Sequence, residues 1–146
     1  MRRKFIRAVG VIACVSAAAN ALAAESYLCA VDAVTGFHSS DGNNWTQVAF
    51  EPKRKFVIAR SKVPGYVWQV TETGDPFPSS ACKEDFSGDS INCGGINEFR
   101  FNRATLKFTI VSQTDFWISD QTRKSLGMGS TRGGVVSLGI GRCTAL

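Results

Sequence analysis

Apolar and polar residues alternate with a period of two along much of the chain, and no long stretch has the period of a helix. The alternation is clearest over 99–110, where Phe99 and Phe101 share one face of a first segment and Leu106, Phe108 and Ile110 share one face of a second. A short polar turn separates the two segments, as in a β-hairpin with one buried face. This pattern predicts strands that turn one face toward a core.

Further segments rich in β-branched and aromatic residues recur between turn-forming residues. The strands that they predict are 26–31, 45–50, 55–60, 66–71 and 135–143. We expect 45–50 and 55–60 to pair as a hairpin across 51–54, and the Gly/Asp/Asn-rich segment that starts at Gly36 to be a loop. Seven or eight short strands predict an all-β fold, a small antiparallel barrel or sandwich. Because open sheet edges are hazardous, we favour a closed or nearly closed barrel.

The N-terminal segment has a different composition. Four basic residues within the first seven precede the apolar stretch 8–19 and the small residues 21–23. This order is typical of a cleaved secretory signal peptide. Cleavage after Ala23 leaves one β domain, 24–146. We therefore expect the protein to be periplasmic or secreted.

The signal segment also affects the export route and the net charge. Arg2-Arg3 resembles the start of a twin-arginine signal, and 11–14 resemble a lipoprotein box, so export in folded form and lipidation at Cys14 stay open as alternatives. The chain has 17 Lys and Arg against 12 Asp and Glu. Four of the basic residues leave with the signal, so the remaining domain is nearly neutral and no nucleic-acid partner is expected. No apolar run is long enough to predict a membrane span.

Four cysteines remain in the mature chain: Cys29, Cys82, Cys93 and Cys143. An even number in an exported chain predicts two disulfides, with three possible connectivities. We favour Cys82 with Cys93, which closes a polar loop, and Cys29 with Cys143, which ties the first strand to the last. The spacing lacks the close cysteine pairs of a zinc site, so no metal or cofactor is expected.

Candidate functional residues fall into two groups. His38 is the single histidine, and a small hydrolase or nuclease that combines it with Glu98 and Arg100 is one alternative. The Ser and Asp neighbours of His38 are on the same loop, whereas a catalytic triad draws its members from separate segments, so we expect a protein that is not an enzyme. Aromatic residues are good anchors for partners. The binding residues that we predict are Phe116, Trp117, Trp45 and Trp68.

Short motifs near both ends of the domain provide a resemblance. They are Tyr27-Leu28-Cys29, Ala33-Val34-Thr35-Gly36-Phe37, Phe99-Arg100-Phe101-Asn102 and Gly141-Arg142-Cys143. With them the chain resembles an uncharacterised family of small secreted proteobacterial proteins, which open on Y-L-C and A-T-G-F and end on G-x-C. The resemblance covers most of 26–146. It implies export and a compact β fold, and it implies no mechanism.

A second similarity is to the periplasmic inhibitors of c-type lysozyme, which are small disulfide-tied β-barrels. Their loop pattern S-G-x-x-Y is half present, as Ser87-Gly88 followed by Ile91 in place of tyrosine, and their T-K-G pattern is absent. Only the architecture therefore carries over to this chain.

The sequence thus predicts a secreted or periplasmic, disulfide-bonded binding module, with a protein inhibitor or interaction protein as one form. Its partner would be an envelope or extracellular protein or a small ligand. One alternative is a lipocalin-like carrier of a small apolar ligand, which requires a cavity of a few hundred Å³ open at one end. The hydrolase or nuclease using His38 is the other alternative. The sequence leaves the oligomeric state open.

Overall fold

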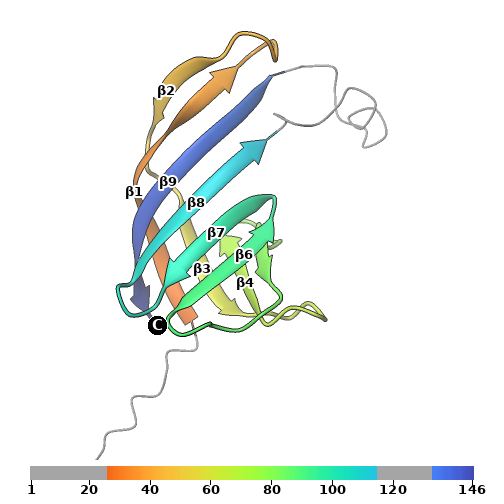
Figure 1. Cartoon of the computed structure of the whole chain (residues 1–146), viewed down its shortest axis with the longest axis vertical. Coiled ribbons are helices and arrows are strands. Elements are labelled where there is room, and N and C mark those ends of the chain that lie inside the picture. The colour runs from red at the N-terminus through yellow and green to blue at the C-terminus, as the bar shows by residue number, and fades with distance from the viewer. Residues whose placement is uncertain (1–25, 115–132) are drawn as a thin grey trace, which may run out of the picture.

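The computed structural model describes residues 26–114 and 133–146 of the chain. All regular structure in this part is antiparallel β-sheet. The strands are β1 (Ser26–Ser39), β2 (Thr46–Phe50), β3 (Lys55–Arg60), β4 (Trp68–Glu72), β5 (Ser80–Cys82), β6 (Ser90–Gly95), β7 (Asn97–Asn102), β8 (Lys107–Thr114) and β9 (Gly134–Ala145). β1 pairs with both β3 and β9, which closes eight strands into a barrel and leaves β2 as an additional strand (Figure 1). The predicted all-β antiparallel barrel is confirmed.

The barrel has walls of unequal height (Figure 1). β1, β9 and β8 contain 14, 12 and 8 residues, whereas β4 to β7 contain three to six. The long strands therefore extend beyond the short ones, and β2 continues them as a sheet. We name this extension the tall wall, which consists of 34–39, 46–50, 111–114 and 134–138. None of the described residues belongs to a helix that could cross a membrane.

β2 and β3 do not pair with each other, so the hairpin expected across 51–54 is wrong. Both strands lie along β1 in series, β2 against 34–38 and β3 against 26–30. The link between them falls opposite a bulge that follows Val31 in β1, and Pro52 in the link has no N–H to donate. The bulge and the proline together divide one long strand into two.

β1 also continues through the segment expected to be a loop. Gly36 lies inside this strand, where a Cβ atom would overlap the carbonyl oxygen of Val136 in β9. The glycine permits two strands to approach closely and does not form a turn. The turn that follows β1 is formed at Asp41, whose carboxylate accepts hydrogen bonds from the backbone N–H groups of Asn43 and Asn44 at 2.9 and 2.8 Å.

Aromatic and aliphatic side chains fill the lower part of the barrel. The buried core residues other than cysteine are Tyr27, Val31, Phe56, Ile58, Trp68, Val70, Ile91, Phe99, Phe101, Phe108 and Ile110. Phe99 stacks on Phe108 with ring centroids 4.9 Å apart, and Phe56 packs edge-on against both rings. The predicted inward alternation is confirmed for Phe99, Phe101, Phe108 and Ile110, which are buried and lie opposite one another across β7 and β8. It is wrong for Leu106, which lies in the turn before β8 with a φ of 55° and is only partly buried.

Both favoured disulfides are confirmed. Cys29 and Cys143 occupy opposite positions of β1 and β9, and Cys82 of β5 bonds to Cys93 of β6. The first bond closes the barrel covalently, and the second turns 83–92 into a closed loop. Two such bonds are compatible with an oxidising compartment.

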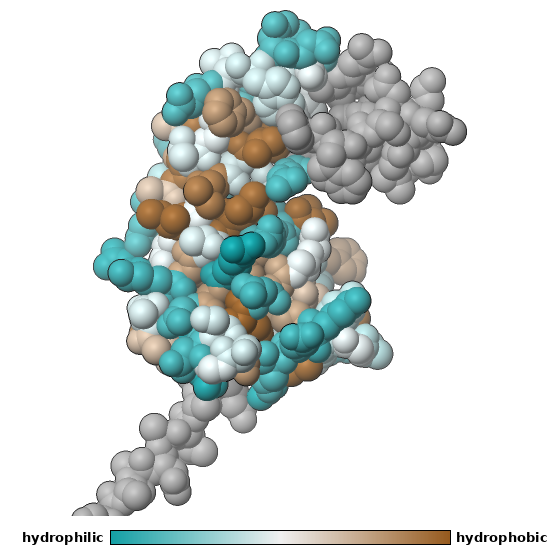
Figure 2. Space-filling view, viewed as in Figure 1, coloured by the Kyte–Doolittle hydropathy of each residue, from teal (hydrophilic) through white to brown (hydrophobic). Residues whose placement is uncertain are grey.

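β9 turns its large apolar side chains outward. Leu138 and Ile140, which the sequence places on one side of this strand, are 47% and 50% exposed on the outer surface. The inward positions include Gly139 and Gly141, and a Cβ atom on Gly141 would meet the ring of Phe108. Small residues of β9 therefore make room for the rings of β8. Figure 2 shows apolar side chains gathered over the tall wall.

Candidate functional site

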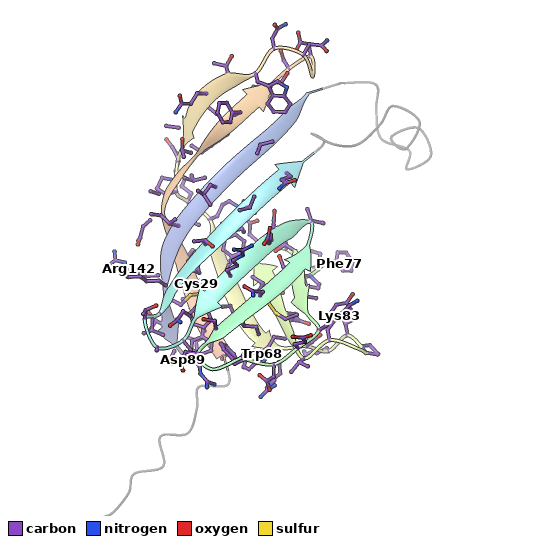
Figure 3. All side chains as sticks on the ribbon, viewed as in Figure 1. Cys29, Trp68, Phe77, Lys83, Asp89 and Arg142 are labelled. Carbon is purple, nitrogen blue, oxygen red and sulfur yellow. A yellow bond between two sulfur atoms is a disulfide. The ribbon has the colours of Figure 1, made fainter. Side chains whose placement is uncertain are left out.

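A loop closes the lower end of the barrel, which we name the sealed end. This loop, 83–92, is held at its base by the disulfide between Cys82 and Cys93. Phe86 of the loop packs edge-on against Trp68 at 5.2 Å and against Phe101 at 6.1 Å. Figure 3 labels Trp68 and Asp89 at this end, beside the C-terminus marked in Figure 1. The loop thus extends the core to the end of the barrel.

Asp85 joins the loop to the barrel wall. Its carboxylate accepts hydrogen bonds from Nε1 of Trp68 at 2.7 Å, from the backbone N–H of Phe86 at 2.8 Å and from Arg60 at 3.1 Å. These bonds, the one from Trp68 first, lower the pKa of Asp85 to about 2. Trp68, which we predicted to bind a partner, is 3% exposed, and the Arg60 guanidinium covers its ring at 4.3 Å. Trp68 therefore packs in the core and has little surface left for a partner.

A second arginine fastens the other side of the loop. The Arg103 guanidinium lies over the Phe86 ring at 4.8 Å, and its Nε donates to Asp89 at 3.2 Å. The backbone N–H of Arg103 also donates to the carbonyl oxygen of Asp89 at 2.8 Å. Within 26–114 and 133–146, no group of His, Cys, Asp or Glu side chains is placed to hold a metal ion. The acidic residues Asp85 and Asp89 bind arginines.

At the opposite end, which we name the open end, the inward side chains change from apolar to polar. On β4 the inward series runs from Val70 to Glu72, and on β8 it runs from Ile110 to Ser112. Polar side chains also line this end from β7, from β9 and from the residue directly before β3. We name this set the polar layer: Arg54, Glu72, Asn97, Ser112 and Ser137.

Hydrogen bonds connect four members of the polar layer. Arg54 donates from Nε and Nη2 to the two carboxylate oxygens of Glu72 at 2.8 and 2.7 Å, and from Nη1 to Ser112 at 3.4 Å. The Ser112 hydroxyl donates to Oδ1 of Asn97 at 2.6 Å. Asn97 is 4% exposed, and its amide nitrogen has no acceptor among the described residues. Buried polar groups normally have hydrogen-bond partners, so this amide is equipped to donate to a ligand.

A pocket of about 530 Å³ lies above the polar layer, against the inner face of the tall wall, and we name it the mouth pocket. The polar layer forms its floor. Its apolar lining consists of Val34, Phe50, Ile96 and Val135. A concave site with apolar walls and a few convergent polar groups is the usual form of a ligand pocket.

The charges around the mouth pocket are not balanced. Glu51 forms an ion pair with Lys53, and the Glu72 carboxylate is neutralised by Arg54. Asp75 also lines the pocket, and its carboxylate has no cationic partner among the described residues. Within 26–114 and 133–146, one negative charge at the edge of the pocket is therefore uncompensated, which favours a positively charged group.

The predicted aromatic residues do not form one surface. Phe116 and Trp117 lie outside the described residues. Trp45 is half-buried directly before β2, on the tall wall, whereas Trp68 lies at the sealed end. The structure therefore separates these two tryptophans by most of the length of the barrel.

The residues of the proposed hydrolase site are also separated. His38 is exposed near the upper end of β1, in register with Thr46 of β2. Glu98 and Arg100 face outward on β7 and form an ion pair with each other. β8 and β9 lie between β7 and β1 in the barrel, so these side chains do not converge on His38.

Sequence reasoning missed the residues of the mouth pocket, although two of them carried a signal. Asn97 lies two positions before Phe99, and Ser112 lies two positions after Ile110, so both continue an inward-facing series. A polar residue at the end of such a series indicates that the interior becomes polar there. No comparable local signal marks Arg54, which lies in the link between β2 and β3.

No protein-family model, curated protein or solved structure matches the chain. The geometry of the mouth pocket is therefore the main support for a functional assignment.

Proposed function

We propose that the protein is an exported binding module, periplasmic or secreted, that holds a basic segment of a partner protein in the mouth pocket. The observation that carries this proposal is the open pocket, with the Asn97 amide on its floor and the Asp75 carboxylate at its edge, which among the described residues lack an acceptor and a cationic partner respectively. The signal-like N-terminus and the two disulfides support export. An inhibitor of an exported enzyme is one form that such a module takes.

Each part of the pocket has a complementary group in a lysine- or arginine-containing peptide. The Asp75 carboxylate attracts the cation, and the Asn97 amide can donate to a backbone carbonyl oxygen. The apolar walls, with Phe50 and Val135, suit the aliphatic stem of a long basic side chain. A basic side chain on a peptide combines all three features in one ligand.

A wholly apolar ligand fits this pocket less well. Aromatic rings fill the interior below the polar layer, so a lipocalin-like carrier would have to hold its ligand in the mouth pocket itself. There an apolar molecule would remove water from Arg54 and Glu72 without returning hydrogen bonds, and uncompensated desolvation of charged groups is unfavourable. The polar layer thus favours a ligand with a polar head.

Three probes with a cationic, an apolar and an anionic side chain test the proposal. They are the N-acetyl, N-methylamide derivatives of lysine, norleucine and glutamate, titrated into the protein and followed by NMR. We expect the lysine probe to shift the backbone amides of Glu72, Asp75 and Asn97 and the glutamate probe to leave them unchanged. Asp75→Asn should weaken binding of the lysine probe by about fivefold, in the range of an exposed charge pair, and leave norleucine unaffected.

A matched variant controls for loss of charge elsewhere. Glu84→Gln removes one negative charge from an exposed side chain at the sealed end and should leave all three titrations unchanged. Equal shifts from the three probes would contradict the preference for a cation. Shifts confined to residues outside the mouth pocket would contradict the assignment of the site.

A further inference from the structure

β2 differs from the other described strands in its pairing. It pairs with β1 along one edge only, through 34–38, and its second edge faces no described strand. Each of the other described strands pairs on both edges for at least part of its length. An unpaired edge presents backbone N–H and C=O groups that can pair with another strand.

The residues of β2 do not protect this edge. Natural edge strands are usually protected by charged side chains, proline or a bulge. β2 has the sequence Thr46-Gln47-Val48-Ala49-Phe50, which contains no charge, proline or glycine. The charged residues and the proline of the link to β3 begin only at Glu51. Among the described strands, this uncharged edge of five residues is therefore open to pairing.

We propose that β2 pairs antiparallel with β2 of a second copy of this chain, which gives a two-fold symmetric dimer. Centred on Val48, this register places Val48 opposite itself and Gln47 opposite Ala49 of the second copy. A two-fold axis brings like positions together, so a charged residue near its centre would meet a like charge. The absence of charge from all five positions of β2 makes the edge self-complementary.

The side chains of β2 continue both faces of the tall wall into this contact. Phe50 lines the mouth pocket, so the pairing joins the inner faces of two tall walls and places two mouth pockets on one continuous sheet. Gln47 lies in register with Phe37, which is 49% exposed on the outer face. Because a five-residue strand pair is a small interface, we expect a weak dimer with a dissociation constant on the order of 10 µM.

Sedimentation of the full disulfide-bonded protein over a range of concentrations tests the dimer. The wild type should change from monomer to dimer with rising concentration. Gln47→Lys with Ala49→Lys should remain monomeric, because each introduced lysine then faces another across the axis. Gln47→Glu with Ala49→Glu should also remain monomeric. An equimolar mixture of the two double variants should dimerise again, since opposite charges then meet at both positions.

Recovery on mixing excludes misfolding as the reason for the monomeric state. Asn92→Lys places a lysine on an exposed position of β6, which is paired on both sides, and should dimerise as the wild type does. A wild type that stays monomeric up to about fifty times the expected dissociation constant would overturn the proposal. Dimerisation of either double variant alone, or failure of the mixture to recover, would also overturn it.

Discussion

The sealed end and the open end of the barrel are built from the same strands and differ in how the inward side chains finish. At the sealed end, Phe86 and two arginine–carboxylate pairs continue the core to the end of the barrel. At the open end, the inward series stops being apolar while β1, β8 and β9 continue upward. A polar floor with a wall on one side is the result. The difference indicates that a pocket forms where the strands continue beyond the last apolar inward side chains.

The two ends also use their charged groups differently. Asp85 and Asp89 are each bound by an arginine that also covers an aromatic ring. At the open end Arg54 likewise binds Glu72 and covers the Phe56 ring, but Asp75 is left without a cationic partner among the described residues. Charges at the sealed end therefore fasten a loop, whereas the open end has the carboxylate that we propose binds the cation of a partner.

The largest effects are expected from removing the disulfides one at a time. Replacing Cys29 and Cys143 by serine should lower the free energy of unfolding by about 5 kcal/mol, because their bond closes a loop over 114 positions of sequence. Replacing Cys82 and Cys93 by serine should cost about 3 kcal/mol, because that bond spans 11 positions. Denaturation in guanidinium chloride measures both values.

Hydrogen exchange shows which end of the barrel the Cys82–Cys93 bond stabilises. In the variant without the Cys82–Cys93 bond, amide exchange should increase first in 83–92, at the sealed end, and least around the polar layer. An equal increase at both ends would contradict the assignment of this disulfide to the sealed end.

A smaller loss of stability is expected when a half-buried phenylalanine is replaced by alanine, and the loss should differ between the two ends of the barrel. Phe86→Ala removes a ring that packs on Trp68 and Phe101, and we expect a loss of about 2 kcal/mol. Phe50→Ala removes a ring that faces the mouth pocket, so fewer packing contacts are lost and the expected cost is below about 1 kcal/mol. Thermal unfolding of the two variants gives the comparison. A larger loss for Phe50→Ala would indicate that the open end is the better packed of the two.

The smallest expected effect is the pH dependence of the sealed end. The pKa of Asp85 is lowered to about 2 in the folded protein, below its unfolded value near 4. Its contribution to stability is therefore complete above about pH 4 and is lost as the pH falls toward 2. Asp85→Asn should reduce this acid-dependent loss, whereas Asp75→Asn should retain it. Urea denaturation between pH 5 and pH 2 would measure both, and identical acid profiles for Asp85→Asn and the wild type would contradict the prediction.

Local sequence patterns were sufficient to predict features that depend on residues close together in the chain. The inward positions of Phe99, Phe101, Phe108 and Ile110 follow from alternation across one short turn. The disulfide pairs followed from an even count of cysteines and their positions along the chain. The all-β class followed from the recurrence of short alternating segments.

Features that depend on distant strands could not be predicted in this way. Alternation identifies β2 and β3 as strands, but it does not specify that both pair with β1. On β9 the glycines at inward positions depend on the size of rings carried by β8, so the sequence of β9 alone does not specify its buried face. The polar layer draws its five side chains from separate segments, and only the closed barrel brings them together.

The bond between Cys29 and Cys143 makes most of the backbone one covalent ring. A protease that cuts once between these two cysteines opens the ring but releases no fragment. The nicked molecule keeps its pieces attached and can retain its strand pairing, which is useful for a protein exposed to proteases. On a gel it would separate into fragments only after reduction. Digestion of the disulfide-bonded protein therefore has to be followed on a reducing gel.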